Sequence, residues 1–142
     1  MLKKIKEPVE VHAAYDVAPE VIFDAWIIPA LIRKWLFVGP TSEIVNVVSD
    51  LKTGGEFSIL ELERTNKEYS DHFGRYQLID RPTQLVFTLS VPKHFSGETT
   101  VRIDIKKTAS GCELTLTQTG VSKNKTARSW KDMLKQLKKV VS

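Results

Sequence analysis

Apolar and polar residues alternate with period two over much of the chain, which predicts a domain built mainly of β-strands. The first such segment, 9–15, places Val9, Val11, Ala13 and Tyr15 on one face. Similar segments bounded by turn residues predict further strands at 56–62, 68–79, 84–89, 99–106 and 112–119. Short connections between successive strands favour antiparallel pairing. In 68–79 the alternation breaks near Phe73-Gly74, which predicts a bulge or a sharp bend.

Three segments show helical spacing instead. Pro19 stands at a favoured helix start, and Pro29 interrupts that helix and begins a second one, with an apolar stripe at Leu31, Ile32, Trp35 and Leu36. The strongest helical pattern covers 126–141, where the apolar stripe consists of Trp130, Met133, Leu134, Leu137, Val140 and Val141. The order of strand, helix pair, strands and long helix predicts an α+β fold, with helices covering one face of a curved antiparallel sheet.

Composition limits the class of protein. A chain of 142 residues with 42% hydrophobic residues is expected to form a single domain over 1–142 without a linker. No apolar run approaches the ~18 residues of a membrane span, and the first residues lack the apolar stretch of a signal peptide, so a cytoplasmic location is expected. The single cysteine, Cys112, alternates with apolar residues and is interpreted as a small core residue.

Charge is distributed unevenly. Residues 1–6 carry three lysines and 123–142 carry seven basic residues against Asp132, whereas 7–122 carry eleven basic against sixteen acidic residues. No basic stripe with exposed aromatic residues is present, which argues against nucleic-acid binding. The lysines of the last helix form either a solvated face or a docking surface for an acidic partner or an anionic membrane.

Several segments, taken in order, resemble one known family. They are 17–26, 29–35, Gly54-Gly55, 73–76, 80–88 and a final helix with Trp130 and Leu134. From Val9 onward the chain is in these respects similar to the Hsp-90 ATPase activator-like family of the START-like (SRPBCC) superfamily. The resemblance implies a helix-grip fold, in which the sheet wraps the C-terminal helix around an apolar pocket. The wider superfamily includes lipid and polyketide binders and some cyclases, and fold alone does not transfer an activity.

The sequence shows no catalytic or cofactor motif. His12, His72 and His94 lack metal-ligand spacing, and there is no nucleophile elbow or phosphate-binding loop, so no metal, cofactor or catalytic set is predicted. His94 lies in the loop 92–97 at a possible pocket mouth. It is either an exposed loop histidine or a group that contacts a ligand or carries a proton.

Glu61 is a carboxylate where related chains often have an apolar residue. Alternation from Phe57 through Ile59 places it on their face, where it would enter the pocket and need a partner or a raised pKa. Alternatively, a bulge at Ile59-Leu60 would leave Glu61 in solvent, and the apolar residues Leu60 and Leu62 favour that alternative.

A candidate pocket wall combines Glu61 with apolar and aromatic residues of the second helix, the strands and the last helix. Its members are Trp35, Phe57, Ile59, Glu61, Phe73, Phe87, Trp130, Met133 and Leu134. Each of the apolar members could equally be ordinary core.

Three functions remain open. The first is the binding of a small apolar or amphipathic ligand. The second, implied by the resemblance and consistent with the basic last helix, is a chaperone-associated protein that interacts with Hsp-90. The third is a cofactor-free cyclase or isomerase in which Glu61 or His94 acts as acid or base.

Overall fold

The computed structural model describes residues 8–121 and 123–142 of the chain. Seven strands and three helices follow one another in an α+β order. They are β1 (Val9–Tyr15), α1 (Pro19–Ile27), α2 (Pro29–Ile32), β2 (Ser42–Ser49), β3 (Glu56–Glu63), β4 (Glu68–Asp80), β5 (Gln84–Leu89), β6 (Thr99–Lys107), β7 (Cys112–Thr119) and α3 (Lys123–Val141). No helix among these described residues is both long and apolar enough to cross a membrane.

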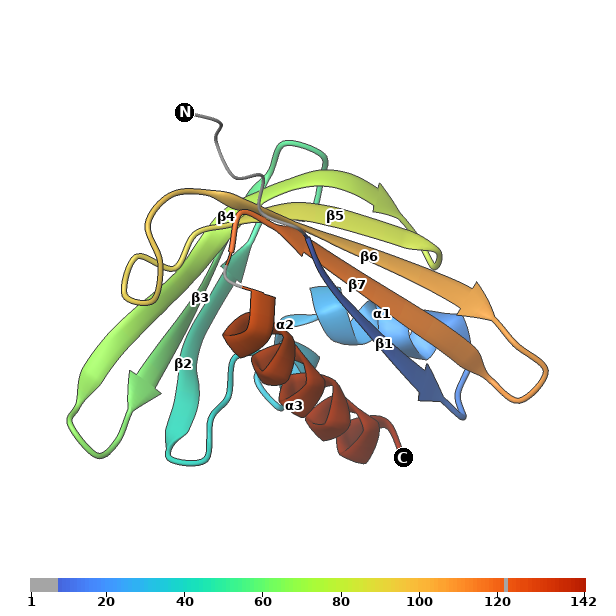
Figure 1. Ribbon diagram of the computed structural model, residues 1–142, viewed down its shortest axis with the longest axis horizontal. Helices are drawn as coiled ribbons and strands as arrows, with labels where there is room; N and C mark the ends of the chain where they lie inside the picture. The colour runs from blue at the N-terminus through green and yellow to red at the C-terminus, as the bar shows by residue number, and fades with distance from the viewer. Residues whose placement is uncertain (1–7, 122) are drawn as a thin grey trace.

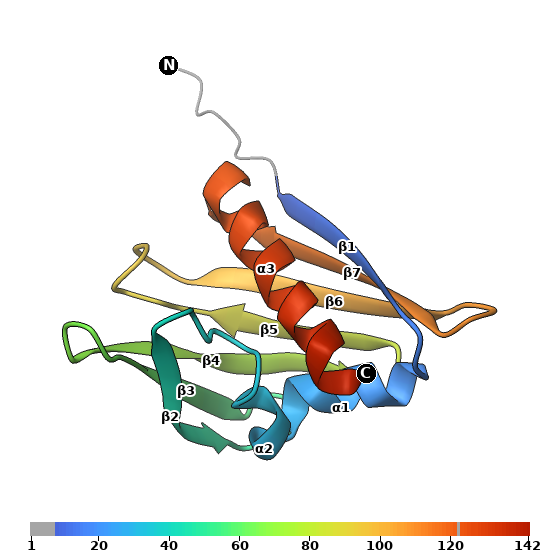
Figure 2. The same ribbon diagram turned by 90° about the horizontal axis from the view of Figure 1, so that it is seen from below.

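The strands form one antiparallel sheet in the order β1-β7-β6-β5-β4-β3-β2. All successive strands are neighbours except β1 and β2, which lie at opposite edges because α1 and α2 carry the chain from one edge to the other. The sheet is strongly curved, and α3 lies across its concave side (Figure 1). Seen from below, α3 runs diagonally over the strands while α1 and α2 cover the remaining part of the same side (Figure 2). This is the predicted helix-grip arrangement.

β4, the longest strand, is irregular near its middle. Its pairing with β5 shifts register between Tyr76 and Leu78, close to the irregularity predicted near Phe73-Gly74. Gly74 allows a close approach of β5, because a Cβ atom there would lie 1.8 Å from the carbonyl oxygen of Thr88. β4 is therefore irregular near its middle, where Gly74 lets β5 approach closely and the register shifts after Tyr76.

Helix α3 is attached to the sheet by apolar contacts and by buried hydrogen bonds. Trp130, Leu134 and Leu137 form its fully buried stripe. The indole Nε1–H of Trp130 donates to Oε1 of Gln118 on β7 at 2.7 Å, and the hydroxyl of Tyr15 on β1 donates to the carbonyl of Leu134 at 3.1 Å. These polar groups are buried, so losing one partner would leave the other unsatisfied.

The second helix is shorter than the apolar stripe predicted. It ends at Ile32, and Trp35 and Leu36 lie in the turns that follow. In these turns the Trp35 N–H donates to the carbonyl of Ile32, three residues earlier. The side chains of Trp35 and Leu36 are still buried. The turns end at Phe37, whose φ is 62°, in the left-handed region.

Candidate functional site

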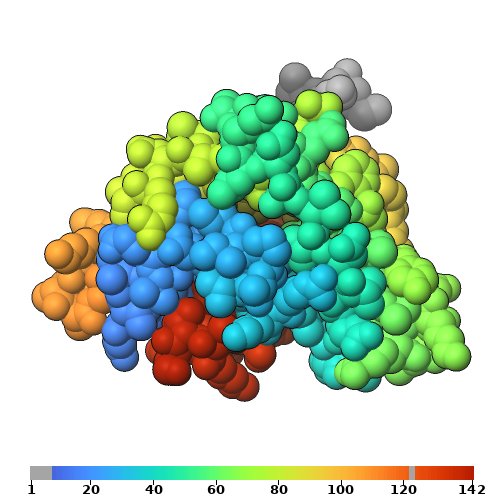
Figure 3. Space-filling model, turned by 180° about the vertical axis from the view of Figure 1, so that it is seen from behind, coloured from blue at the N-terminus to red at the C-terminus, as the bar shows by residue number. Residues whose placement is uncertain are grey.

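The space between the sheet and the helices is filled mainly by aromatic side chains. Trp26 of α1 is central, with ring-centroid distances of 4.7 Å to Trp35, 5.9 Å to Trp130 and 6.2 Å to Phe87. These residues come from α1, the turn after α2, α3 and β5, so the cluster joins all the layers of the domain. In the space-filling view from behind, α1 and α2 (blue) lie between the green strand segments and the red end of α3 (Figure 3).

A small cavity remains in this interior. It has a volume of about 10 Å³ and is lined by Trp26, Ile32, Leu36, Phe37, Val47, Ser49, Phe57, Ile59, Tyr76 and Phe87. A volume of this size is about the minimum that admits one water molecule. The indole Nε1–H of Trp26 is buried and has no hydrogen-bond partner among the described residues. The interior is therefore apolar and nearly filled, with one unpaired donor on a cavity-lining residue.

A carboxylate and an imidazole meet on the concave face beside this interior. In the β3–β4 pairing, Glu61 lies opposite Ser70 and Ile59 lies opposite His72. The His72 Nε2 atom is 3.0 Å from Oε1 of Glu61, and the two side chains are only 6% and 17% exposed. A hydrogen bond of this length to a buried carboxylate is charge-assisted and fixes the orientation of the ring.

The surroundings of Glu61 keep it ionised. Burial would raise the pKa of its carboxyl, but hydrogen bonds from His72 and Ser42 and the nearby imidazoles of His72 and His94 outweigh that effect. They hold the pKa below its ordinary value of 4.5. Ser42, at the start of β2, also accepts the N–H of Gly39 at 2.8 Å, which fixes its side chain in place. Glu61 is thus a negative group supported from β2 and β4 and by the loop after β5.

The Phe37 ring covers the imidazole of His72. The two rings stack with their centroids 4.0 Å apart and an angle of 10° between their planes. The Phe37 backbone N–H donates to Sδ of Met133 at 3.2 Å, and its ring is 5.8 Å from that of Trp130. Because Phe37 also lines the small cavity, the same ring adjoins both the cavity and the imidazole.

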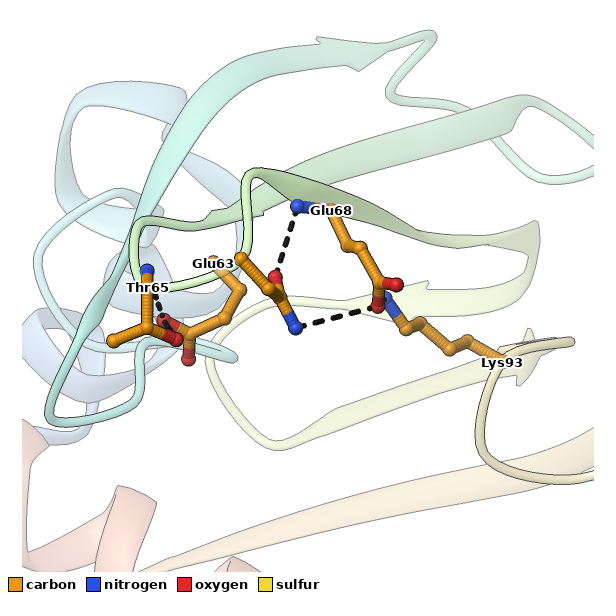
Figure 4. A network of polar contacts seen from close by, with 5 residues as sticks. Glu63, Thr65, Glu68 and Lys93 are labelled. Atoms are coloured by element: carbon orange, nitrogen blue, oxygen red, sulfur yellow. Dashed lines mark hydrogen bonds and ion pairs between the residues drawn. The ribbon is translucent and has the colours of Figure 1, made fainter.

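His94 lies in the loop between β5 and β6, which is attached to the β3–β4 turn. Lys93 pairs with Glu68, the backbone N–H of Glu68 donates to Asn66 at 2.9 Å, and the N–H of Thr65 donates to Glu63 at 3.1 Å (Figure 4). Burial and the electrostatic effect of the neighbouring His72 imidazole lower the pKa of His94 most, with Glu61 acting in the opposite direction. His94 is therefore close enough to interact electrostatically with both members of the pair.

The residues predicted from the sequence as a pocket wall lie in three environments. Trp35, Phe57, Ile59, Phe87, Trp130 and Leu134 are buried, and of these Phe57, Ile59 and Phe87 line the cavity. Glu61 and Met133 are half-buried near His72 and Phe37. The bulge that would have turned Glu61 to solvent is absent from β3, whose pairing with β4 is regular.

Phe73 was placed wrongly by the prediction. His72 and Gly74, its neighbours in β4, belong to the concave face, so Phe73 belongs to the outer face and is 39% exposed. There it contributes to an open groove of about 380 Å³, together with Val48, Ser58 and Thr88. Phe73 thus lies on the side of the sheet opposite to the aromatic interior.

Three residues of the site were missed by the sequence reasoning. Trp26, Phe37 and His72 were not among the candidates, although His72 alternates with Ser70 and Tyr76 on the concave face of β4. That alternation was the available signal for His72. No group of three His, Cys, Asp or Glu residues within the described ranges could hold a metal ion.

Solved structures show the same fold at low sequence identity. Protein CV1439 from Chromobacterium violaceum superposes with a TM-score of 0.86 at 20% identity, covering 96% of this chain and 98% of its own. A protein from Rhodobacter sphaeroides gives 0.84 at 20% identity, with coverage of 94% and 91%. The AHSA1-like protein from Aeromonas hydrophila gives 0.81 at 17% identity, with coverage of 95% and 92%.

Sequence comparison extends this likeness to a family. None of the curated proteins matches the chain. The family model described as Activator of Hsp90 ATPase homolog 1-like protein, however, matches residues 16–142, which is most of the chain. The likeness includes the segments on which the sequence resemblance rested, from the helix pair to the final helix. The chain therefore belongs to the Activator of Hsp90 ATPase homolog 1-like family.

Proposed function

We propose that this protein binds a small amphipathic ligand between the concave face of the sheet and helix α3. The apolar part of the ligand would lie among the aromatic side chains, and its polar group would lie at Glu61 and His72. The single observation that carries the proposal is the buried Glu61–His72 pair beside a mainly aromatic interior. A few polar groups in an apolar enclosure are typical of small-ligand sites.

The interior must open to admit a ligand. Ligand pockets usually measure about 300–1,000 Å³, whereas this cavity has about 10 Å³. Phe37 is the residue that best accounts for such an opening. Its left-handed backbone, φ 62°, is unfavourable for a bulky residue, and its ring adjoins both the cavity and His72. Outward movement of Phe37 would connect the cavity to the polar pair.

Thermal unfolding with a ligand panel tests the proposal. Fatty acids, lipids, alcohols and polyketide-like aromatic compounds would each be titrated against the purified protein. A ligand that binds only the native state raises the melting temperature with concentration and adds about 2.7 kcal/mol of stability at a hundredfold excess over its Kd. A panel that produces no shift at saturating concentrations, in the wild type and in the Phe37→Ala variant, would contradict the proposal.

The Phe37→Ala variant tests the proposed opening. Removing this ring uncovers His72 and enlarges the cavity, so the variant should bind the best panel ligand more tightly than the wild type does. Phe73→Ala is the matched control, since it removes the same ring from the outer face and should leave affinity unchanged. Unchanged or weaker binding by Phe37→Ala would show that Phe37 does not control access.

Interaction with Hsp90 is a second candidate, favoured by the basic side of α3 and by the family description. Lys131, Lys135, Lys138 and Lys139 are all exposed. Such a surface suits an acidic partner, and attraction between exposed charges weakens as salt rises. Purified Hsp90 should then be retained by the immobilised protein at low salt, less at moderate salt, and less by a Lys135→Glu, Lys138→Glu variant. No retention at low salt would eliminate this candidate.

A further inference from the structure

Two neighbouring polar groups on the concave face of β4 have no partner. Ser70 Oγ and His72 Nδ1 are both buried and make no hydrogen bond within the described part of the chain. Leaving a buried donor or acceptor unpaired costs about 1–3 kcal/mol, and most such groups in native proteins are paired. The two residues are also adjacent on one face, because side chains at i and i+2 of a strand point the same way. This pair of atoms is suited to a ligand group.

The chemistry of that group follows from the hydrogen bonds already present. Glu61 is ionised and accepts, so His72 donates through its Nε2–H. In the neutral ring this leaves Nδ1 as a bare acceptor, which is also the form in which an unpaired buried nitrogen is least unfavourable. The Ser70 hydroxyl can donate. A hydroxyl can donate to His72 and accept from Ser70 at the same time.

The spacing of the two residues allows one oxygen to contact both. Residues i and i+2 of a strand are about 6.6 Å apart, and each hydrogen bond spans about 2.8 Å. Side chains that lean toward one another can therefore share a single hydroxyl.

The charge of the site excludes a carboxylate ligand. Glu61 is negative and its pKa is held below the ordinary value, so a second carboxylate beside it would be repelled. Lys93, in the nearby loop, is already paired with Glu68. The neighbouring rings are aromatic: Phe37 stacks on the imidazole, and Trp130 lies next to Phe37.

We infer that the ligand is a neutral, apolar molecule with a hydroxyl group. This hydroxyl donates to Nδ1 of His72 and accepts from the hydroxyl of Ser70, while Glu61 holds the His72 ring in the required tautomer. This inference rests on the proposed function and specifies its ligand class.

Three matched probes test the inference by calorimetric titration. They are 2-naphthol, 2-methoxynaphthalene, which lacks the donor, and 2-naphthoate, which is negatively charged. Wild type and Phe37→Ala should both bind 2-naphthol about tenfold more tightly than either other probe, the effect of one hydrogen bond. Equal affinities, or tighter binding of 2-naphthoate, would overturn the hydroxyl assignment and leave ligand binding standing. Failure of both proteins to bind any probe would count against the proposed function itself.

Substitutions identify which residues cause the preference for 2-naphthol. His72→Phe should bind 2-naphthol and 2-methoxynaphthalene equally, and the same substitution at the exposed His12 is the control and should keep the tenfold preference. Ser70→Ala removes an unpaired hydroxyl, so it should fold normally and bind 2-naphthol more weakly than the wild type does. An imidazole nitrogen NMR spectrum gives a readout independent of any variant. It should show His72 protonated at Nε2 and its Nδ1 signal shifting when 2-naphthol is added. A His72 protonated at Nδ1, or an unshifted signal with bound 2-naphthol, would overturn the inference.

Discussion

The charge of Glu61 is supported by residues from three separate parts of the chain. Ser42 lies at the start of β2, His72 lies in β4, and His94 lies in the loop after β5. Each favours the ionised carboxylate, whereas burial opposes it. Because these contacts exist only in the folded protein, ionisation of Glu61 and folding are thermodynamically coupled.

Glu61→Gln should flatten the acid side of the stability profile. The folded pKa of Glu61 lies below its ordinary value of 4.5, so the unfolded chain binds its proton first as pH falls. The stabilisation is therefore present above about pH 4.5 and is lost as pH falls through the folded pKa. Free energies of unfolding measured by denaturant between pH 7 and pH 3 should decline less steeply in the variant than in wild type.

Other groups contribute to the same profile without obscuring this difference. Asp24, whose pKa is lowered chiefly by its hydrogen bond from Arg81, acts in the same acid range in both proteins. His94 acts at higher pH. Its folded pKa lies below its ordinary value of 6.5, so its protonation lowers the stability of the fold, and this effect disappears as pH rises past 6.5. Glu43→Gln, an exposed change on β2, is the control. Identical slopes in wild type and Glu61→Gln would refute the coupling of Glu61.

Only part of the site could be predicted from single residues. Period-two spacing from Phe57 to Glu61 placed Glu61 on the face of Phe57 and Ile59, although Leu60 and Leu62 favoured a bulge, and the β3–β4 pairing is regular without one. The partner of Glu61 could not be read in this way. His72 lies opposite Ile59 rather than opposite Glu61, so the contact is diagonal and depends on a register that the turn between the strands sets. Phe37 reaches His72 only through its left-handed backbone, which no sequence pattern signals.

At the level of elements, clean alternation predicted strands well. The bounds of β1, β5 and β7 agree with the prediction, and β3, β4 and β6 each extend one residue further. The exception is β2, for which no separate bounds were predicted. Its pairing with β3 shifts register between Ile44 and Asn46, and such an irregularity changes which side chains share a face. The apolar and polar residues of β2 therefore do not alternate regularly.

Helices were predictable where their apolar stripe was long. The stripe of α3 extends over several turns and buries Trp130, Leu134 and Leu137, and the helix begins at Lys123, before the predicted start at residue 126. The stripe after Pro29 is too short to distinguish a helix from successive turns, because both bury residues three or four positions apart. Only the segment as far as Ile32 became α2.

For the whole molecule, the central contacts join layers that are distant in sequence. Trp130 of α3 contacts Trp26 of α1 and Phe37 after α2, and it donates to Gln118 of β7. Gln118 in turn donates to Thr99 of β6 at 3.0 Å. One side chain therefore connects the terminal helix, the helix pair and the sheet, and it is 2% exposed. Such a residue belongs to the core even though it lies near the proposed ligand site.

Trp130→Ala should consequently reduce stability more than it alters ligand binding. Truncating a buried tryptophan costs about 3–5 kcal/mol, and the loss here also leaves Gln118 without its donor. Trp130→Phe is the matched variant, because it keeps one aromatic ring while it removes the N–H and the rest of the indole, and it should cost less. Chemical denaturation and 2-naphthol titration would be measured on both variants, with affinity determined in the folded fraction. A small change in the denaturation midpoint together with a large loss of affinity would instead assign Trp130 to the wall of the ligand site.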